Sequence, residues 1–150
     1  MSNKHVKAYG IALYKLEDQK IKLLLCKSVK SKNKWGFLKG VQLGKESAKE
    51  CAKREFTEES SIKVETEYFE EYFEQLNKEK DIGIWLVNSK NIEKLYNYFD
   101  EDDKLYDKFL SLENSKVKYF SLDELPHFKK KQKELIIKIK DFLKNKNQHH

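Results

Sequence analysis

The stretch GVQLGKESAKECAKREFTEESSI, residues 40–62, carries the strongest local signals in this chain. Ser47, followed three residues later by Glu50, forms a capping box, in which each side chain bonds to a free backbone N–H of the other residue. A helix over Ser47–Glu59 is therefore predicted. At about 100° per residue, its apolar side chains fall on one side and predict the buried face: Ala48, Cys51, Ala52 and Phe56.

Three carboxylates lie close to that buried face. Glu55, Glu58 and Glu59 have the spacing i, i+3 and i+4, which brings side chains together on a helix. Converging negative charges repel one another and lose hydration on the inward side, so a bound cation would stabilise them. Carboxylate oxygens suit Mg²⁺ or Mn²⁺, which keep several waters and take their other ligands from carboxylates and phosphates. For the triplet alone, scattered glutamates on a solvated helix are an equally good interpretation.

The spacing around the triplet is more specific. Five residues separate Gly40 from Glu46, and seven separate Glu46 from Arg54. This pattern resembles the Nudix box, G-x5-E-x7-R-E-U-x-E-E-x-G-U, in which U is a bulky apolar residue. The matching positions of this chain are Gly40, Glu46, Arg54, Glu55, Phe56, Glu58, Glu59 and Ile62. Six fully specified residues would coincide by composition alone about once in 10⁶ registers.

One position departs from the box. The family has a glycine where this chain has Ser61, and that glycine normally ends the helix with a positive φ. A serine in the left-handed region costs about 1 kcal/mol or forces a different helix end. Because Ser61 is not one of the metal ligands of the box, we expect a small change in geometry and no loss of activity.

The resemblance implies an enzyme of the α/β class (α+β type), with the Nudix-like α/β/α sandwich around a mixed β-sheet. It also implies that Glu58 and Glu59 bind a catalytic Mg²⁺ or Mn²⁺, and that Glu55 is a metal ligand or the general base. Arg54 would hold the carboxylates in place by ion pairs. Glu46 would pair with Arg54 or reach a second metal ion.

Outside the box the likeness is weaker. Trp35–Gly40 is similar to the W-x-F-P-K-G segment of diadenosine tetraphosphate hydrolases and RNA pyrophosphohydrolases, with Leu38 in place of proline. The backbone carbonyl of Lys39 would then complete the metal shell. Glu113–Tyr119 resembles the E-H-x-x-Y-R-W segment of the same enzymes, although only Glu113 is carried over. The resemblance makes Glu113 a further metal ligand or the general base; otherwise it is a solvated loop residue.

Candidate substrate-binding residues lie on both sides of the box. Lys39, and with it Lys78 or Lys80, would bind the outer phosphates as point charges. Tyr72 or Trp85 would stack on a nucleobase, although aromatic residues at alternate strand positions are more often part of the core. Dinucleoside polyphosphate hydrolases often have a tyrosine where this chain has Lys78, so this position does not match that subgroup.

The remaining elements follow from apolar periodicity. It predicts five strands over Val6–Tyr14, Lys20–Cys26, Val64–Leu76, Ile82–Val87 and Lys116–Ser121. A closing helix is predicted over Lys129–Leu143, and two short helices within Asn91–Leu112, which is either a decorative insertion or a lid beside Glu113. One domain over residues 1–148 follows, and His149–His150 are interpreted as the remnant of a purification tag.

Composition excludes more than it assigns. A net charge of +6 favours anionic partners, but a general preference for lysine explains it equally well. Cys26 and Cys51 form no Cys-x-x-Cys pair and are predicted to be small buried apolar residues. Neither a secretory signal nor a long apolar span is visible, so a cytoplasmic protein with no membrane association is expected. The sequence does not specify an oligomeric state.

Two substrate classes fit this machinery. The first is a nucleotide polyphosphate such as diadenosine tetraphosphate, and the second is the 5′-triphosphate end of RNA, which a basic surface suits. The lysines of the final helix, Lys129–Lys131 among them, are interpreted as solvated surface because lysines occur along the whole chain. This favours the dinucleotide. A catalytically silent Nudix-fold binding module would not need all the box glutamates, and no stacking or groove-reading motif supports a nonspecific RNA-binding protein.

Overall fold

The sheet of this protein is mixed, with one parallel pair at its centre. The computed structural model describes residues 5–148, and five strands run in the order β4-β5-β1-β2-β6, with β3 pairing to β1 beside this path. The strands are β1 (Val6–Glu17), β2 (Lys20–Ser28), β3 (Leu38–Val41), β4 (Tyr72–Gln75), β5 (Lys80–Asn88) and β6 (Asn114–Ser121). β1 runs parallel to β5, whereas β1–β2, β1–β3, β2–β6 and β4–β5 are antiparallel.

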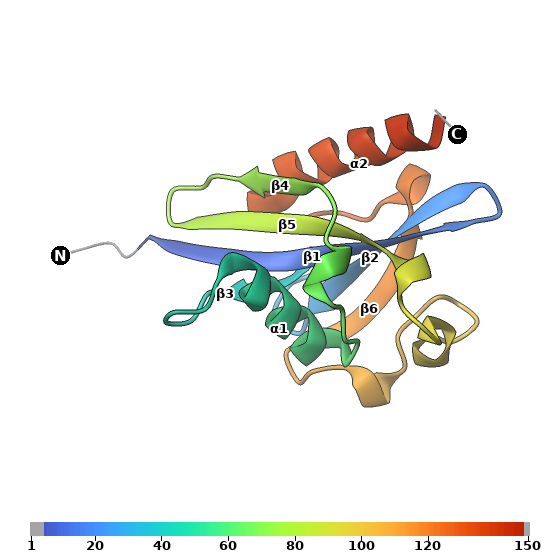
Figure 1. Ribbon diagram of the computed structural model, residues 1–150, viewed down its shortest axis with the longest axis horizontal. Helices are drawn as coiled ribbons and strands as arrows, with labels where there is room; N and C mark the ends of the chain where they lie inside the picture. Colours follow the sequence, from blue (N-terminus) through green and yellow to red (C-terminus); the bar gives the residue numbers. More distant parts are fainter. Residues whose placement is uncertain (1–4, 149–150) are drawn as a thin grey trace.

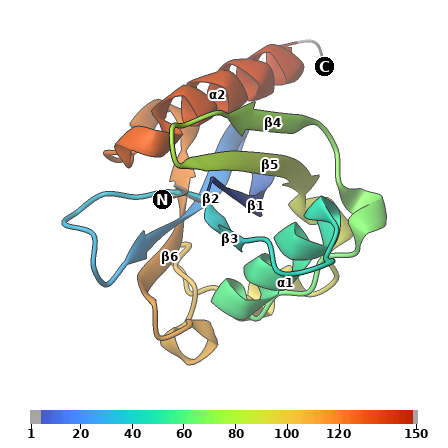
Figure 2. The ribbon, with the colours of Figure 1, turned by 90° about the vertical axis from the view of Figure 1, so that its left-hand side faces the viewer.

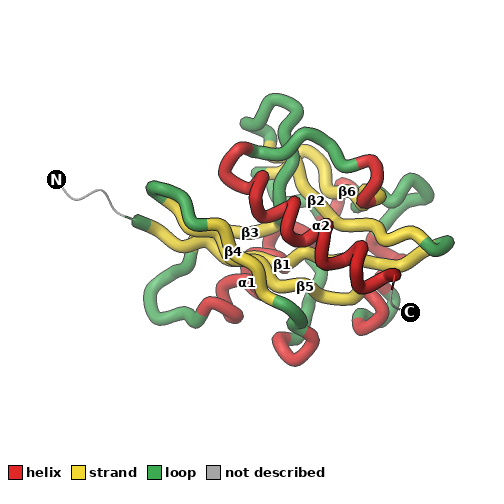
Figure 3. The backbone as a smooth tube through the Cα atoms, turned by 90° about the horizontal axis from the view of Figure 1, so that it is seen from above, coloured by secondary structure: helices red, strands yellow, loops and turns green. Residues whose placement is uncertain are grey.

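The two helices cover opposite faces of this sheet. Helix α1 (Ala48–Ser60) lies below it in Figure 1 and helix α2 (Lys133–Gln148) lies above it, an arrangement that Figure 2 shows end-on. Seen from above in Figure 3, α2 crosses over the strands. The predicted α/β/α sandwich around a mixed sheet is confirmed.

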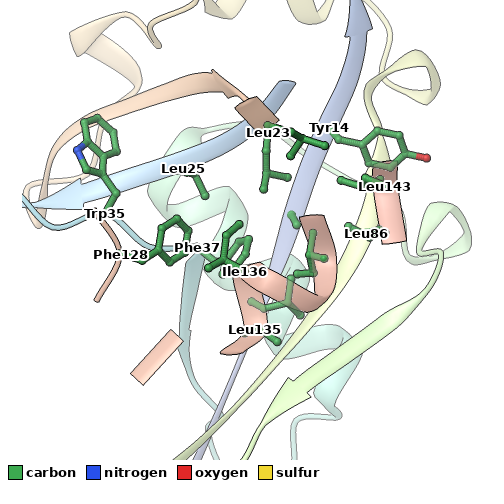
Figure 4. Close-up of a cluster of buried hydrophobic side chains, with 14 of the residues drawn as sticks. Tyr14, Leu23, Leu25, Trp35, Phe37, Leu86, Phe128, Leu135, Ile136 and Leu143 are labelled. Carbon is green, nitrogen blue, oxygen red and sulfur yellow. The ribbon is translucent and has the colours of Figure 1, made fainter. Parts of the chain in front are cut away.

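Each face of the sheet has its own apolar core. Under α2, a cluster drawn in Figure 4 joins the helix residues Leu135, Ile136, Ile139 and Leu143 to Leu23, Leu25 and Leu86 of the strands. Under α1, Ala52 and Phe56 pack against Ile11, Leu13, Leu24 and Leu38. The face predicted to be buried in α1 is buried at Cys51, Ala52 and Phe56, whereas Ala48 is partly exposed. Cys26 and Cys51 are both buried, as predicted.

The strand predicted over Val64–Leu76 is wrong in its first half. Only Tyr72–Gln75 pairs as β4, and the preceding segment holds a 3₁₀ turn at Thr66–Tyr68. Its alternation of apolar and acidic residues resembles a strand, but the chain must here travel from the end of α1 to the edge of the sheet. Val64 packs into the core under α1 on the way.

The two short helices predicted within Asn91–Leu112 are also wrong. The structure has 3₁₀ turns at Ser89–Asn91, Leu95–Tyr98 and Asp107–Phe109 instead. Between them the chain covers the outer edge of β6, where the backbone N–H of Leu105 donates to the Val117 carbonyl (2.8 Å) and the Leu105 side chain is fully buried. The apolar spacing reflects these contacts with the sheet and not a helix face.

No helix within residues 5–148 is long and apolar enough to cross a membrane. The interpretation of His149–His150 as a tag remnant concerns residues outside those described, and the single domain over residues 1–148 stays a prediction.

Candidate active site

Helix α1 begins at the predicted capping box and ends just before Ser61, the position of the box glycine. The backbone N–H of Glu50 donates to Ser47 Oγ (3.1 Å) and that of Ser47 donates to Glu50 Oε1 (3.0 Å), so the capping box is confirmed. At the other end Ser61 adopts φ 67° and its N–H donates to the Thr57 carbonyl (2.7 Å). Ser61 therefore takes the left-handed conformation expected of the box glycine, and α1 ends at Ser60, directly before it.

Arg54 gathers the carboxylates of the box. Its Nε and Nη2 donate to the two oxygens of Glu46 at 2.6 and 3.0 Å, and its Nη1 donates to Glu55 at 2.8 Å and to Glu58 at 3.0 Å. Nη2 also donates to the Val41 carbonyl of β3 (3.2 Å). The guanidinium lowers the pKa of Glu46 to about 2. One cation thus holds three acidic side chains against the end of β3.

Gly40 and Glu55 depend on each other. A Cβ atom added to Gly40 would overlap the Glu55 carboxyl group, so only glycine leaves room for that side chain against β3. The Glu55 side chain is 16% exposed. Burial raises its pKa, opposed by the ion pair with Arg54. The box glycine therefore serves to admit a half-buried carboxylate.

Glu59 is the most deeply buried carboxylate of the cluster. It is 8% exposed, and its Oε1 lies 3.4 Å from Asn114 Nδ2 and 3.9 Å from the Cys26 sulfur. Burial, and next the negative charge of Glu55, raise the pKa of Glu59 to about 8. A carboxylate in this position is poorly compensated by the protein itself, which is the condition that favours cation binding.

Glu58 does not lie where the helical wheel predicted. Its side chain is 54% exposed and contacts Arg54, whereas Cys51, two turns earlier on the same side of the helix, is covered by the Gly40 carbonyl of β3. Only Glu55 and Glu59 are turned inward, so the prediction of three inward carboxylates is corrected. Glu58 sits at the solvent-facing rim of the cluster.

Glu113 lies beside this cluster, although it comes from a distant part of the sequence. It directly precedes β6, and its backbone carbonyl accepts a hydrogen bond from the Val29 N–H (2.9 Å). Its side chain is exposed, yet its charge is close enough to raise the pKa values of Glu55 and Glu59. Because the next residue, Asn114, bonds to Glu59, Glu113 lies at the edge of the acidic cluster.

Asn114 is a site residue that sequence reasoning missed. In this chain it stands where the E-H-x-x-Y-R-W segment has its histidine. It is buried at the start of β6 and donates to Glu59. The available signal was its place directly after Glu113, at the inward position of a strand.

The acidic cluster fits a divalent cation by its chemistry. Within residues 5–148, no three acidic, histidine or cysteine side chains are arranged around a common point, because Arg54 draws Glu55 and Glu58 towards itself. The donors are nevertheless hard carboxylate oxygens, two of them half-buried or buried with raised pKa values. Such a set suits Mg²⁺ or Mn²⁺. Lys39, whose carbonyl the resemblance adds to the shell, is next to Gly40 in β3.

A strongly basic cavity adjoins the acidic cluster. It has a volume of about 400 Å³, and six lysines line it: Lys34, Lys39, Lys80, Lys129, Lys130 and Lys131. Burial, and then the charges of Lys80 and Lys129, lower the pKa of Lys39. Lys39 in turn is close enough to lower the pKa of Glu59. Lys130 and Lys131 are exposed and Lys129 is partly buried, so the interpretation of Lys129–Lys131 as solvated surface stays a prediction, although all three also line this cavity.

The other predicted substrate residues are divided. Lys80 lines the basic cavity, whereas Lys78 is exposed on the β4–β5 turn and is not part of its lining. Tyr72 and Trp85 pack on each other (ring centroids 4.5 Å apart), and Trp85 also contacts Tyr9 and Phe69. This aromatic cluster shares no lining residue with the basic cavity. The structure thus brings Lys39 and Lys80 together and leaves Lys78, Tyr72 and Trp85 apart from them.

Comparisons with known proteins identify the family and the fold of this chain. The family profile described as the NUDIX domain matches residues 4–140. A Caenorhabditis elegans Ap4A hydrolase in a binary complex is similar in structure, with a TM-score of 0.62, 23% identity, and 93% of this chain and 98% of that chain covered. A second structure of the C. elegans Ap4A hydrolase has a TM-score of 0.51 and 25% identity, over 79% of this chain and 82% of that one.

A third similar structure is the NUDIX domain of Shewanella oneidensis NrtR complexed with ADP ribose. Its TM-score is 0.63 at 15% identity, and the match covers 93% of this chain and 88% of that chain. The comparison with curated proteins found no match.

Proposed function

Because this chain belongs to the NUDIX domain family of pyrophosphohydrolases, we propose that it cleaves a pyrophosphate bond in dinucleoside polyphosphates such as diadenosine tetraphosphate. The observation that carries the proposal is that Lys39 lines the basic cavity and is next to Gly40 in β3, which lies against the Glu55 carboxyl group. Carboxylates on one side would hold a divalent cation at the bond that breaks. Lysines on the other side would bind the phosphates that lie further along the chain. A substrate with several consecutive phosphates spans both.

The residues divide the reaction between them. Glu55, Glu58 and Glu59 would hold the metal ion, which supplies charge neutralisation at the phosphate oxygens and acidifies water. Arg54 keeps the carboxylates of Glu46, Glu55 and Glu58 together. Either Glu113 or Glu55 would accept the proton of the attacking water.

The lysines would act on the leaving group. A Lys ammonium binds phosphate as a point charge, and cleavage of a polyphosphate leaves additional negative charge on the departing oxygen. Lys39, which lines the cavity next to the box glycine and has no carboxylate partner among the described residues, is suited to a phosphate next to the cleaved bond. Lys80 and Lys129 would bind the following phosphates. This supports a product that itself keeps several phosphates, as ATP does.

The aromatic residues have no such support. Tyr72 and Trp85 belong to the cluster with Tyr9 and Phe69, and the side chain of Tyr72 fills the space above Gly83. Their contacts are those of sheet packing. We therefore assign specificity to the phosphate chain and leave base stacking out of the proposal.

Diadenosine tetraphosphate should be cleaved efficiently, with ATP as one product, and with only a shallow dependence on salt. The cavity of about 400 Å³ accommodates a few phosphates, whereas an RNA end would add backbone phosphates outside it. Binding of single-stranded RNA through such contacts weakens with a slope of about −0.7 per phosphate in a logarithmic salt plot. The measurement is kcat/KM for diadenosine tetraphosphate and for a short triphosphorylated RNA, at two salt concentrations with Mg²⁺.

The same experiment separates the rival functions. A preference for the RNA that disappears as salt rises would favour an RNA 5′-pyrophosphohydrolase, for which the exposed Lys130 and Lys131 at the cavity are the specific observation. Binding of both substrates without turnover of either would indicate a silent binding module. The control is heat-inactivated protein, which excludes hydrolysis by contaminating metal ions alone.

Glu113→Gln should lower kcat by roughly 10²-fold or more while changing KM modestly, because glutamine cannot accept the proton of the attacking water. Glutamine keeps the size of the side chain, and the backbone bond to Val29 does not involve it. Steady-state kinetics with diadenosine tetraphosphate measures the effect. Glu124→Gln, an exposed change just beyond the other end of β6, is the matched control. A decrease below about threefold would return the role of base to Glu55.

A further inference from the structure

The lysines that line the basic cavity repel one another, and no acidic side chain in its lining offsets this repulsion. Six lysines line it, and its other lining residues, Ser31, Ile82 and Gln132, carry no negative charge. Like charges at short range repel one another, and more strongly where they are partly removed from water. Lys129–Lys131 belong to the connection between β6 and α2. Some other contact must hold that connection beside Lys39 when no anion is present.

Gln132 provides this contact. It is 3% exposed, and its Oε1 accepts a hydrogen bond of 2.8 Å from the Phe37 N–H, two residues before Lys39. The neighbouring backbones are also joined, because Trp35 N–H donates to the His127 carbonyl (2.8 Å) and Lys129 N–H donates to the Trp35 carbonyl (3.0 Å). The segment with three lysines is thus fixed to the segment that leads into β3.

The space for Gln132 is made by a glycine. A Cβ atom on Gly36 would come within 2.7 to 2.8 Å of the Gln132 amide oxygen and nitrogen. Gly36 and Gln132 therefore fit each other as Gly40 and Glu55 do in the acidic cluster. A side chain at residue 36 would displace the amide that holds the lysine segment.

A second amide holds the same segment from the opposite side. Asn77 Nδ2 donates to the Lys131 carbonyl (3.1 Å) and to the Lys80 carbonyl (3.0 Å), which joins the lysine segment to the start of β5. Amide side chains can hold the lysine segment by hydrogen bonds without adding charge to the cavity. A carboxylate in the same place would attract the lysines and compete with a phosphate ligand for them.

We propose that Gln132 is a positioning residue for phosphate binding, which holds Lys129–Lys131 beside Lys39 against their mutual repulsion before the substrate enters. The inference rests on the proposed function in one respect only, namely that the ligand of the cavity is a polyphosphate. A cavity whose charges are already in place does not spend binding free energy on assembling them. Gln132 contacts none of the carboxylates, so it acts on substrate affinity and not on the chemical step.

Gln132→Met tests this inference with little change in side-chain volume. It removes the acceptor of the Phe37 N–H, and the lysine segment should move away from Lys39. We expect KM for diadenosine tetraphosphate to rise about tenfold with kcat within about twofold of wild type, as for loss of ground-state binding. The affinity of the metal-free protein for inorganic tripolyphosphate, measured by calorimetry, should fall by a similar factor. Higher salt should reduce the ratio of mutant to wild-type KM, because it screens the repulsion between lysines.

Two further variants keep the result unambiguous. Gly36→Ala displaces the Gln132 amide while leaving the residue itself in place, and it should reproduce the rise in KM even if Gln132→Met fails to fold. Ile139→Val weakens the core under α2 away from the cavity and should leave KM and tripolyphosphate affinity unchanged. Wild-type affinities and KM values in both Gln132→Met and Gly36→Ala would overturn the inference. So would a matching change in Ile139→Val.

The calorimetry also separates this inference from the proposed function. Wild-type protein that binds tripolyphosphate but does not hydrolyse diadenosine tetraphosphate would refute the substrate and support the cavity, provided Gln132→Met weakens that binding. Wild-type protein that does not bind tripolyphosphate would refute the role given to Gln132, whatever its hydrolytic activity.

Discussion

Glu59→Gln should lower kcat by several orders of magnitude and leave the fold intact. Glu59 is the buried carboxylate of the cluster, and a neutral amide in its place cannot supply the charge that holds a divalent cation at the reacting phosphate. The amide keeps the size of the side chain and can still bond to Asn114. Circular dichroism would establish the fold, and single-turnover hydrolysis would measure the chemical step. Turnover near the wild-type rate would show that the box is not used for catalysis.

The same substitution should change the pH dependence of stability in metal-free protein. The pKa of Glu59 is raised to about 8 in the folded state from 4.5, so between these values the folded state binds more protons than the unfolded state. The free energy of unfolding therefore falls as pH rises through this window. Glu59→Gln removes the group and should flatten that decline. Urea titrations in EDTA at pH 5 and pH 8 provide the measurement.

Glu58→Gln separates the loss of a metal ligand from the effect of burying a carboxylate on stability. Glu58 is a metal ligand by resemblance, but its side chain is exposed and pairs with Arg54. The Glu58→Gln variant should therefore lose activity as Glu59→Gln does. Its free energy of unfolding should still fall between pH 5 and pH 8 as in the wild-type protein. Identical pH profiles for all three proteins would contradict the burial argument for Glu59.

EDTA should abolish hydrolysis, and Mg²⁺ or Mn²⁺ should restore it. Without a cation, Arg54 is bonded to Glu55 and Glu58, and the buried Glu59 has no ion-pair partner among the described residues. A divalent cation would draw these oxygens together and offset their repulsion. Activity assays after dialysis against EDTA test this, and full turnover without metal would contradict it.

Binding of the cation should also be visible without any substrate. A ligand that binds only the folded state raises the melting temperature, and the rise should be larger at pH 8 than at pH 5, because protons compete for the same carboxylates. Glu59→Gln should lose most of this shift. Glu124→Gln, which changes an exposed carboxylate outside the cluster, should keep it.

The sequence was sufficient where the signal is local. The capping box of Ser47 and Glu50 and the bond between Arg54 and Glu58 depend on residues three or four positions apart, and both were predicted. The box motif also identified Gly40 and Glu46, which contact Glu55 and Arg54 of that helix. The approach of Glu113 to this cluster was predicted only by resemblance, since it comes from the start of β6.

The failures depend on contacts between distant segments. The segment containing Leu105 was predicted as helix because its apolar spacing does not reveal that β6 needs a neighbour along its edge. That Lys129–Lys131 line one cavity with Lys39 could not be predicted, because nothing near them in the sequence indicates Lys39. Glu58 was placed inward because a helical wheel cannot show where β3 covers the helix and where it does not.

The parallel pairing of β1 with β5 has a consequence for how the protein is made. Val6 pairs with Lys80 and Tyr14 with Asn88, so one side of the first strand has no partner until nearly ninety residues have left the ribosome. Contacts of such large sequence separation form late and slow folding. During synthesis α1 emerges before β5 and can pack on β1 and β3, while the neighbouring edge of β1 is still open to pairing with other chains. Ribosomes that stall between α1 and β5 would therefore release an aggregation-prone fragment that already carries the whole Nudix box.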